Sequence, residues 1–242
     1  MRLSGMWGAL MALVVALWSG MAFAAPDDKS AAEDKSGKPN PVEMVFEHKH
    51  LQNVDPGKEI VYKFNRTVSN PQMLGEPFSD DITLKIKAEK PDGGRDVDLQ
   101  IYTGERARDL QQMPDRQHNP VFLVYFNQAV SSFGMLSGAK TPYLTRLFSV
   151  GFKEKSKVEP VKVDYKGKQV DAYRITMAPY KGDRNEAKMQ GWESAQYVLV
   201  LSDQVPGQIV DLVAKYDNKY TPNMQITERI TLDGVTGLEE VK

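Results

Sequence analysis

Apolar and polar residues alternate with a period of two over most of the chain, in short runs that are separated by turns. The clearest run places Ile82, Leu84 and Ile86 on one face and threonine and lysine on the other. Successive side chains of a β-strand point to opposite faces, so this run predicts a half-buried strand. Pro-Asp-Gly-Gly at 91–94 follows it and has the composition of a turn. Short turns join antiparallel neighbours, and the pattern therefore predicts an antiparallel sheet.

Similar alternation predicts strands on both sides of this one, about nine in total. The expected strands lie near 44–48, 60–68, 82–87, 97–101, 161–165, 170–177, 197–201, 209–216 and 226–232. The segments 104–118 and 179–194 are polar and show no such period, and we interpret them as connections. Because the outward positions are polar, one side of the sheet is expected to be covered and the other solvated.

The period changes to about 3.5 between Asn119 and Phe152. Five residues recur at intervals of four, three, four and three: Phe122, Phe126, Ala129, Phe133 and Leu136. This spacing predicts a helix over 120–136, which Asn119 would cap and Gly138 would end. The run Val121–Phe126 alone also resembles a buried strand, because it is rich in β-branched and aromatic residues. We favour the helix, since the stripe continues for about ten residues beyond that run.

A second apolar stripe predicts a second helix over 142–150. Thr141 can cap this helix, Pro142 suits its first turn, and Gly151 is expected to end it. The fold class that follows is α+β: a mainly antiparallel, curved β-sheet, half-barrel-like, with a central two-helix insertion.

The N-terminal residues 1–24 have the features of a secretory signal peptide of bacterial style. Arg2 supplies a positive charge, residues 6–18 are apolar, and residues 22–24 match an A-x-A cleavage site. The apolar run is shorter than a membrane-spanning helix requires. We therefore expect cleavage near Ala24, no transmembrane segment after this removal, and a periplasmic location in a Gram-negative cell.

Residues 25–41 are small, charged and Pro-bearing, without an apolar period, and we interpret them as a disordered linker. Residues 42–242 are then expected to form a single antiparallel β-rich domain. The chain is 41% hydrophobic, which is ordinary for a soluble globular protein. Its 31 basic and 32 acidic residues leave a net charge of −1, so there is no basic excess to bind a nucleic acid. The absence of cysteine excludes disulfides, thiolate metal sites and cysteine nucleophiles.

Histidines offer one candidate metal site. His48 and His50 lie two apart in an expected strand, so both side chains would point to one face. Such a pair could hold zinc or copper only with a third ligand, and the one other histidine, His118, lies far along the chain. We interpret the pair as exposed histidines at a strand end and assign no metal.

Ser137–Lys140 matches the S-x-x-K pattern of serine acyl-transferring enzymes. The partner motifs of that pattern are absent, because Ser202 and Asp203 are followed by glutamine rather than asparagine. We interpret the four residues as the turn between the helices, and we expect no catalytic residue, no cofactor and no enzymatic activity.

Basic side chains gather around the helical segment. They are Arg106, Arg108, Arg116, Lys140 and Arg146. Such a group could dock an anion or a lipid headgroup, or it could serve solubility alone.

Four passages resemble a family of uncharacterised exported proteobacterial proteins. They are GGRDVD (93–98), TGERAR (103–108), NPVFLVYF (119–126) and LSDQVPG (201–207). The expected architecture, a curved sheet with a helical lid between its strands, is also similar to the LolA-like lipoprotein carriers of the periplasm. This second resemblance rests on architecture and implies a carrier for an apolar ligand, with no functional residue transferred.

The leading hypothesis is a soluble periplasmic binding or carrier protein for an apolar ligand such as a lipid or acyl chain. The two helices would close the concave sheet over that ligand. The residues expected to contact it are Phe122, Tyr125, Phe126, Phe133, Leu136, Tyr143, Leu147 and Phe148. In the alternative, these aromatic residues are ordinary core, and the protein is a cell-envelope interaction or structural module with a protein partner and no small ligand.

Overall fold

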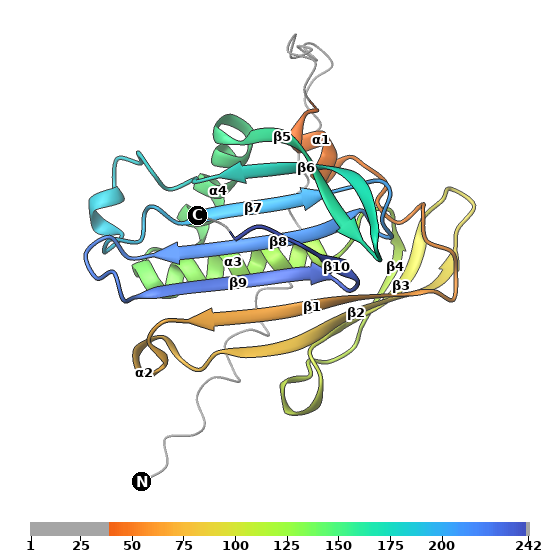
Figure 1. Cartoon of the computed structure of the whole chain (residues 1–242), viewed down its shortest axis with the longest axis horizontal. Coiled ribbons are helices and arrows are strands. Elements are labelled where there is room, and N and C mark those ends of the chain that lie inside the picture. The colour runs from red at the N-terminus through yellow and green to blue at the C-terminus, as the bar shows by residue number, and fades with distance from the viewer. Residues whose placement is uncertain (1–38, 241–242) are drawn as a thin grey trace. The chain divides into compact units, whose positions relative to one another are not determined.

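The computed structural model describes residues 39–240, and ten strands within this range form one sheet. Their order across the sheet is β10-β5-β6-β7-β8-β9-β1-β2-β3-β4, and every neighbouring pair is antiparallel (Figure 1). The strands are β1 (Glu59–Val68), β2 (Phe78–Glu89), β3 (Arg95–Ile101), β4 (Gln111–Arg116), β5 (Lys157–Tyr165), β6 (Lys168–Met177), β7 (Gln196–Leu201), β8 (Ile209–Asp217), β9 (Gln225–Leu232) and β10 (Val235–Thr236).

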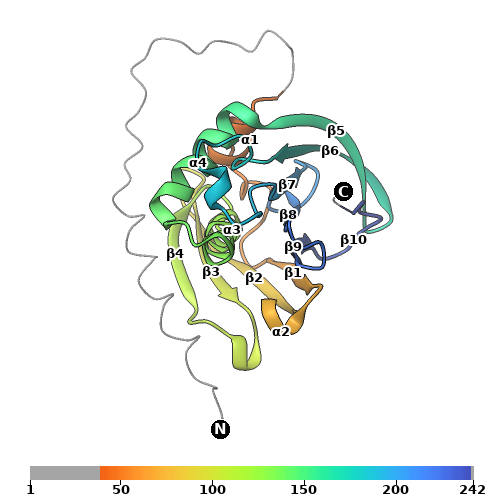
Figure 2. The ribbon, with the colours of Figure 1, turned by 90° about the vertical axis from the view of Figure 1, so that its left-hand side faces the viewer.

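The described residues also form helices before and between the strands. They are α1 (Pro41–Phe46), α2 (Pro71–Leu74), α3 (Val121–Ser137) and α4 (Thr141–Lys155), with short 3₁₀ turns η2 (Gly104–Arg106) and η3 (Glu186–Lys188). Figure 2 shows α3 on the concave side, with α4 and α1 beside it, while the β5–β6 hairpin bends away to meet β10. The sheet is open, with β4 and β10 as its edges. The predicted fold class, a curved antiparallel half-barrel with a central two-helix insertion, is confirmed.

The helix α3 forms where the 4-3-4-3 spacing predicts it, and Val121–Phe126 is helical rather than a strand. The side chain of Asn119 accepts a hydrogen bond from the N–H of Val121 at 3.1 Å, and Gly138 ends the helix in the left-handed conformation. The second helix does not stop at Gly151 but continues to Lys155. A Cβ on Gly151 would lie 2.5 Å from that of Pro179, so this glycine permits close packing rather than ending the helix.

The strand expected near 44–48 is wrong, because this segment begins with the helix α1. The Asn40 side chain accepts a hydrogen bond from the N–H of Val42 at 2.9 Å, and Pro41 occupies the first turn. Met44 and Val45 are the buried residues of this helix. Six residues are too few for a strand period and a helical period to differ clearly, so the capping residues decide.

The connection expected over 104–118 contains an additional strand, β4, at the edge of the sheet. Its residues are mostly exposed, which removes the apolar alternation that marks the other strands. Pro114 lies within it, as is common on edge strands that have one free side. This strand carries Arg116 toward the start of α3.

Two tyrosine hydroxyls tie the helical layer to the sheet. Tyr125 of α3 donates a hydrogen bond to the carbonyl of Val213 at 2.7 Å, and Tyr216 of β8 donates to the carbonyl of Ala129 at 3.2 Å. All four residues are buried. Because a buried hydroxyl without a partner is costly, these bonds fix how α3 sits on the strands.

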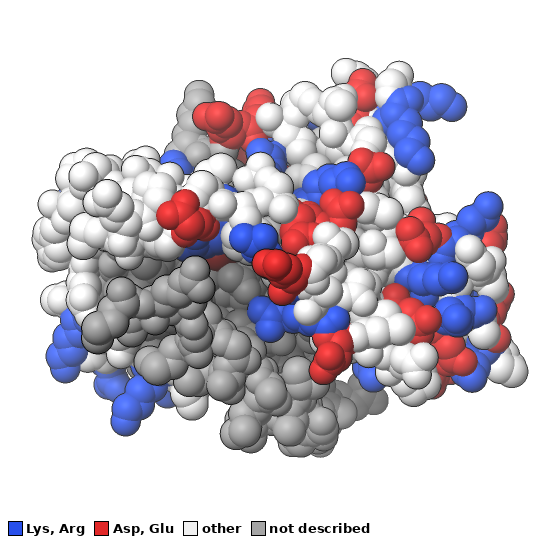
Figure 3. Space-filling view, turned by 90° about the horizontal axis from the view of Figure 1, so that it is seen from below, with Lys and Arg blue, Asp and Glu red and all other residues white. Residues whose placement is uncertain are grey.

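The outer face of the sheet is polar over β1, β2 and β3, as the alternation predicts, whereas β7 and β8 are buried on both faces. Figure 3 views the molecule from below rather than onto the sheet, and positive and negative side chains are intermixed on the described part of this side. Ion pairs join neighbouring strands or the turn beside them: Lys63–Asp81 at 3.0 Å, Lys87–Asp98 at 3.4 Å and Lys90–Asp96 at 2.8 Å. Such exposed pairs contribute little to stability but keep the face solvated.

The predicted signal peptide, 1–24, and most of the predicted linker, 25–41, lie outside the described residues. Pro41, the last linker residue, already belongs to α1. Among residues 39–240, none of the helices combines the length and hydropathy that crossing a membrane would need.

Candidate functional site

A groove of about 200 Å³ lies between α1 and the first turns of α3. We call it the α1–α3 groove. Its lining residues are Val45, Phe46, Arg116, His118, Asn119, Pro120, Phe122, Leu123 and Phe126. Three separate parts of the chain meet here, namely α1, the end of β4 with the residues after it, and α3.

The apolar wall of the groove consists mainly of stacked phenylalanine rings. The Phe46 and Phe126 rings are 5.7 Å apart and nearly parallel, as are those of Phe122 and Phe126 at 6.1 Å. Phe46 remains 43% exposed, and Leu123 is 36% exposed. Large apolar side chains that stay in water beside a groove are typical of a binding surface rather than of a core.

Polar groups occupy the end of the groove near the start of α3. Arg116 and His118 are exposed, whereas Asn119 is buried. The Asn119 amide donates to the Tyr62 hydroxyl at 2.8 Å and to the carbonyl of Gly207 at 2.9 Å. Asn119 is therefore committed to the scaffold, and Arg116 and His118 are the polar groups that a ligand can reach.

His50 supports the groove from beneath. Its ring is buried 5.0 Å from that of Phe122, and its Nε2–H donates to the carbonyl of Met44 at 2.8 Å. Its Nδ1 accepts from the N–H of Asn119 at 3.4 Å. Burial lowers the pKa of His50 to about 4, so the ring is neutral at pH 7.

The fold brings His118 close to the histidines of the N-terminal segment, which the sequence did not suggest. The rings of His50 and His118 are 5.9 Å apart, and His118 Nδ1 donates to the carbonyl of His48 at 2.9 Å. These nitrogens face backbone atoms. Within residues 39–240, the structure contains no group of three or more side chains arranged to hold a metal ion.

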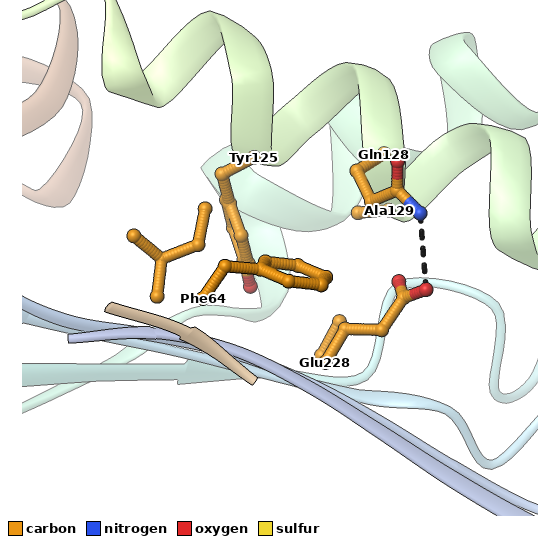
Figure 4. A pocket seen from close by; sticks show the side chains of 7 residues that line it. Phe64, Tyr125, Gln128, Ala129 and Glu228 are labelled. Carbon is orange, nitrogen blue, oxygen red and sulfur yellow. Dashed lines mark hydrogen bonds between the residues drawn. The ribbon is translucent and has the colours of Figure 1, made fainter. Parts of the chain in front are cut away.

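A second cavity lies on the other side of α3, between this helix and the sheet. Its volume is about 10 Å³, roughly the space of one water molecule. It is lined by Phe64, Tyr125, Gln128, Ala129, Ala214, Glu228 and Ile230, five of which are labelled in Figure 4. In this conformation the cavity is too small for an acyl chain.

Glu228 of β9 holds α3 onto the sheet beside this cavity. Its carboxylate accepts hydrogen bonds from Ser132 at 2.9 Å and from Gln128 at 3.0 Å, and lies 3.4 Å from the guanidinium of Arg66 (Figure 4 shows the Gln128 bond). Glu228 is only 4% exposed, and burial raises its pKa above the usual value of 4.5. The sequence signal for this group was a glutamate at an inward position of an otherwise apolar strand face.

The eight predicted ligand-contacting residues do not share one cavity. Phe122 and Phe126 line the α1–α3 groove, and Tyr125 lines the small internal cavity. The other five pack elsewhere. The ring centre of Phe133 lies 3.8 Å from that of Tyr180, and the ring centre of Phe148 lies 4.9 Å from that of Tyr197. Leu136 and Leu147 are half-buried against the core, and the Tyr143 hydroxyl donates a hydrogen bond to Asp183. Their role in binding stays a prediction.

The sequence analysis missed several groove residues, namely Val45, Phe46, His118 and Leu123 as ligand contacts. Arg116 was among the basic residues noted near the helices, but nothing in its spacing placed it beside Phe122. The S-x-x-K segment forms the turn between α3 and α4. There the Ser137 hydroxyl donates to the carbonyl of Phe133 at 2.7 Å.

No protein-family model matches the chain, and neither does any curated protein. Among solved structures, the Mycobacterium tuberculosis lipoprotein LppX is similar over 76% of this chain and 89% of its own, with 8% identity and a TM-score of 0.27. A DUF1329 family protein from Desulfovibrio piger is similar over 78% of this chain and 89% of its own, with 10% identity and a TM-score of 0.23. Likenesses of this size carry no information about function.

Proposed function

We propose that this chain is a non-catalytic periplasmic binding or carrier protein for an apolar ligand such as an acyl chain. The ligand occupies the α1–α3 groove rather than the space beneath α3. The observation that carries the proposal is an open groove of about 200 Å³ in which Phe46 and Leu123 stay exposed beside the buried, stacked rings of Phe122 and Phe126.

The size of the groove limits the ligand. An apolar cavity of about 150 Å³ holds a benzene molecule, so about 200 Å³ takes a slightly larger group, such as an acyl segment of roughly six to eight carbons. Burying that many methylenes contributes about 5 to 6 kcal/mol before association costs are subtracted. A longer chain would extend from the open mouth of the groove.

The lining residues support binding rather than catalysis. Among the nine residues there is no serine, cysteine, aspartate or glutamate. The buried imidazole of His50 has both ring nitrogens bonded to backbone atoms. A nucleophile with an adjacent base, which covalent catalysis requires, is therefore not found among the residues lining the groove.

Uptake of a fluorescent fatty acid by the purified protein tests the proposal. Leu123→Asp places a charge in the groove and should weaken binding by about tenfold or more, because a carboxylate would have to be desolvated. Met135→Asp is the matched control, since Met135 lies on the same helix, is 64% exposed and does not line the groove. Equal binding by wild type and Leu123→Asp, or no uptake by wild type, would remove the proposal.

The second candidate function is a cell-envelope interaction module whose partner inserts an apolar side chain into the same groove. The exposure of Phe46 and Leu123 favours it, because apolar groups of this kind also anchor protein interfaces. A photo-cross-linker at position 123, used in intact cells, separates the two functions. A covalent adduct with lipid supports the carrier, and a discrete protein adduct supports the module.

A further inference from the structure

We infer that the ligand of the α1–α3 groove carries an anionic headgroup, a carboxylate or a phosphate, which binds Arg116 and His118. This inference rests on the proposed function and names the substrate class more narrowly. It depends on the charge distribution at one end of the groove, independently of the apolar wall.

Arg116 supplies a positive charge with no acidic partner in the groove. Four other arginines form ion pairs within residues 39–240: Arg66 with Glu228, Arg95 with Glu89, Arg174 with Glu239 and Arg229 with Asp211. Over the same range Arg116 forms none, and none of the groove's lining residues is acidic. An anion from outside the chain would complete this site.

The strand register places a second arginine next to Arg116. Arg116 of β4 lies directly opposite Arg95 of β3. The Arg95 side chain is buried, and its guanidinium is 2.9 Å from Glu89, which balances its charge. The residue opposite Arg116 is therefore another arginine rather than a carboxylate, and it offers Arg116 no ion pair.

His118 offers a second contact. Its Nδ1 must carry a proton, because it donates to the carbonyl of His48, and a carbonyl can only accept. The remaining nitrogen, Nε2, is therefore the one that a ligand can meet. When Nε2 also carries a proton, its N–H can donate a hydrogen bond to an anionic oxygen.

The arrangement orients the ligand along α3. The polar groups precede the helix, and Phe122 and Phe126 follow one turn apart, so the axial span from Asn119 to Phe126 is about 10 Å. The headgroup would sit at the start of α3, and the chain would run along the phenylalanine stack toward Phe46. A guanidinium binds both carboxylate and phosphate through paired hydrogen bonds, so the geometry admits either headgroup.

Calorimetry with three ligands that share an eight-carbon chain tests the inference: octanoate, octyl phosphate and octanol. The wild-type chain should bind at least one of the two anions about tenfold more tightly than octanol, and this preference should shrink at high salt. The stronger anion identifies the headgroup as carboxylate or phosphate. Octanol binding as tightly as both anions would overturn the inference while leaving the proposed function intact, whereas no binding of any ligand would overturn both.

Substitutions at Arg116 and His118 test whether these residues cause the preference for anions over octanol. Arg116→Gln should lose the preference for the anion by about tenfold and leave octanol binding unchanged, with a smaller loss for His118→Gln. Arg108→Gln is the control, because Arg108 lies 6.0 Å over the Tyr102 ring and does not line the groove. Arg116 is exposed, so its replacement should leave the folded state intact, which circular dichroism checks. An undiminished anion preference in Arg116→Gln would overturn the assignment.

Discussion

The two ends of the aromatic stripe on α3 differ in how deeply their packing partners are buried. Near the end of the helix, Phe133 is fully buried and stacks on the buried Tyr180. Near its start, Phe126 stacks on Phe46 of α1, and Phe46 is 43% exposed beside about 200 Å³ of open groove. One stripe at helical spacing therefore packs into the core at one end and against a water-exposed ring at the other.

The polar groups divide in the same way. Beneath α3, Glu228 is surrounded by Ser132, Gln128 and Arg66, so its hydrogen-bonding capacity is used within the fold. Beside the groove, Arg116 and His118 keep donors that the described residues do not occupy with a carboxylate. Polar groups that are bonded within the fold fix a core, whereas water-exposed ones at the edge of an apolar groove can bind a group from outside the chain.

Truncation of the buried Phe133 should have the largest effect on stability. Phe133→Ala removes a fully buried ring and leaves a void, which should lower the free energy of unfolding by about 3 to 5 kcal/mol. Urea denaturation followed by circular dichroism measures this change. A loss below about 1 kcal/mol would mean that the space beneath α3 is loosely packed, contrary to the small cavity observed.

Acid should destabilise the groove side through His50. Its folded pKa of about 4 lies below the unfolded value of 6.5, so the unfolded chain binds more protons between these pH values. Stability should therefore fall as the pH drops from about 6.5 to 4, by up to about 3 kcal/mol from this residue. His50→Gln should flatten the stability profile in this window, while His48→Gln should keep most of the slope. Identical slopes for wild type and His50→Gln would show that His50 titrates freely.

Whether a feature of the fold or of the groove could be predicted from the sequence depends on whether that feature is periodic along the chain. The alternation at Ile82, Leu84 and Ile86 and the 4-3-4-3 spacing of α3 repeat over enough residues to define the sheet and its helices. The helix α1 was missed because six residues carry little periodicity. Its caps, Asn40 and Pro41, were the usable signal.

The groove is not periodic, which is why it was not predicted. It forms where Phe46, Arg116 and Phe122 meet from three segments, and no spacing along the chain reports that meeting. Nor does hydrophobicity tell which phenylalanine stays exposed, because exposure depends on what packs opposite. Glu228 was more predictable, since a carboxylate on an apolar strand face signals a buried polar contact.

Replacing Glu228 should have an intermediate effect that depends on the substitute. Glu228→Ala strands Ser132 and Gln128 without their acceptor and should cost about 2 kcal/mol in urea denaturation. Because burial raises the pKa of Glu228, the folded state favours its protonated form, and its contribution to stability falls as the pH rises above 4.5. Glu228→Gln mimics that form and should be at least as stable as wild type at pH 8. A Gln variant as unstable as the Ala variant would show that the charge itself holds α3.

The smallest effect on stability should come from Phe46, although it is as aromatic as Phe133. Phe46→Ala removes a side chain that is already 43% exposed, so it should cost about 1 kcal/mol or less. The same change deletes one wall of the groove and should weaken octanoate binding by about tenfold, measured by calorimetry on the sample used for urea denaturation. Loss of binding without loss of stability is the signature of a binding surface. A destabilisation as large as that of Phe133→Ala would make the groove part of the core, and the two ends of the stripe would then no longer differ.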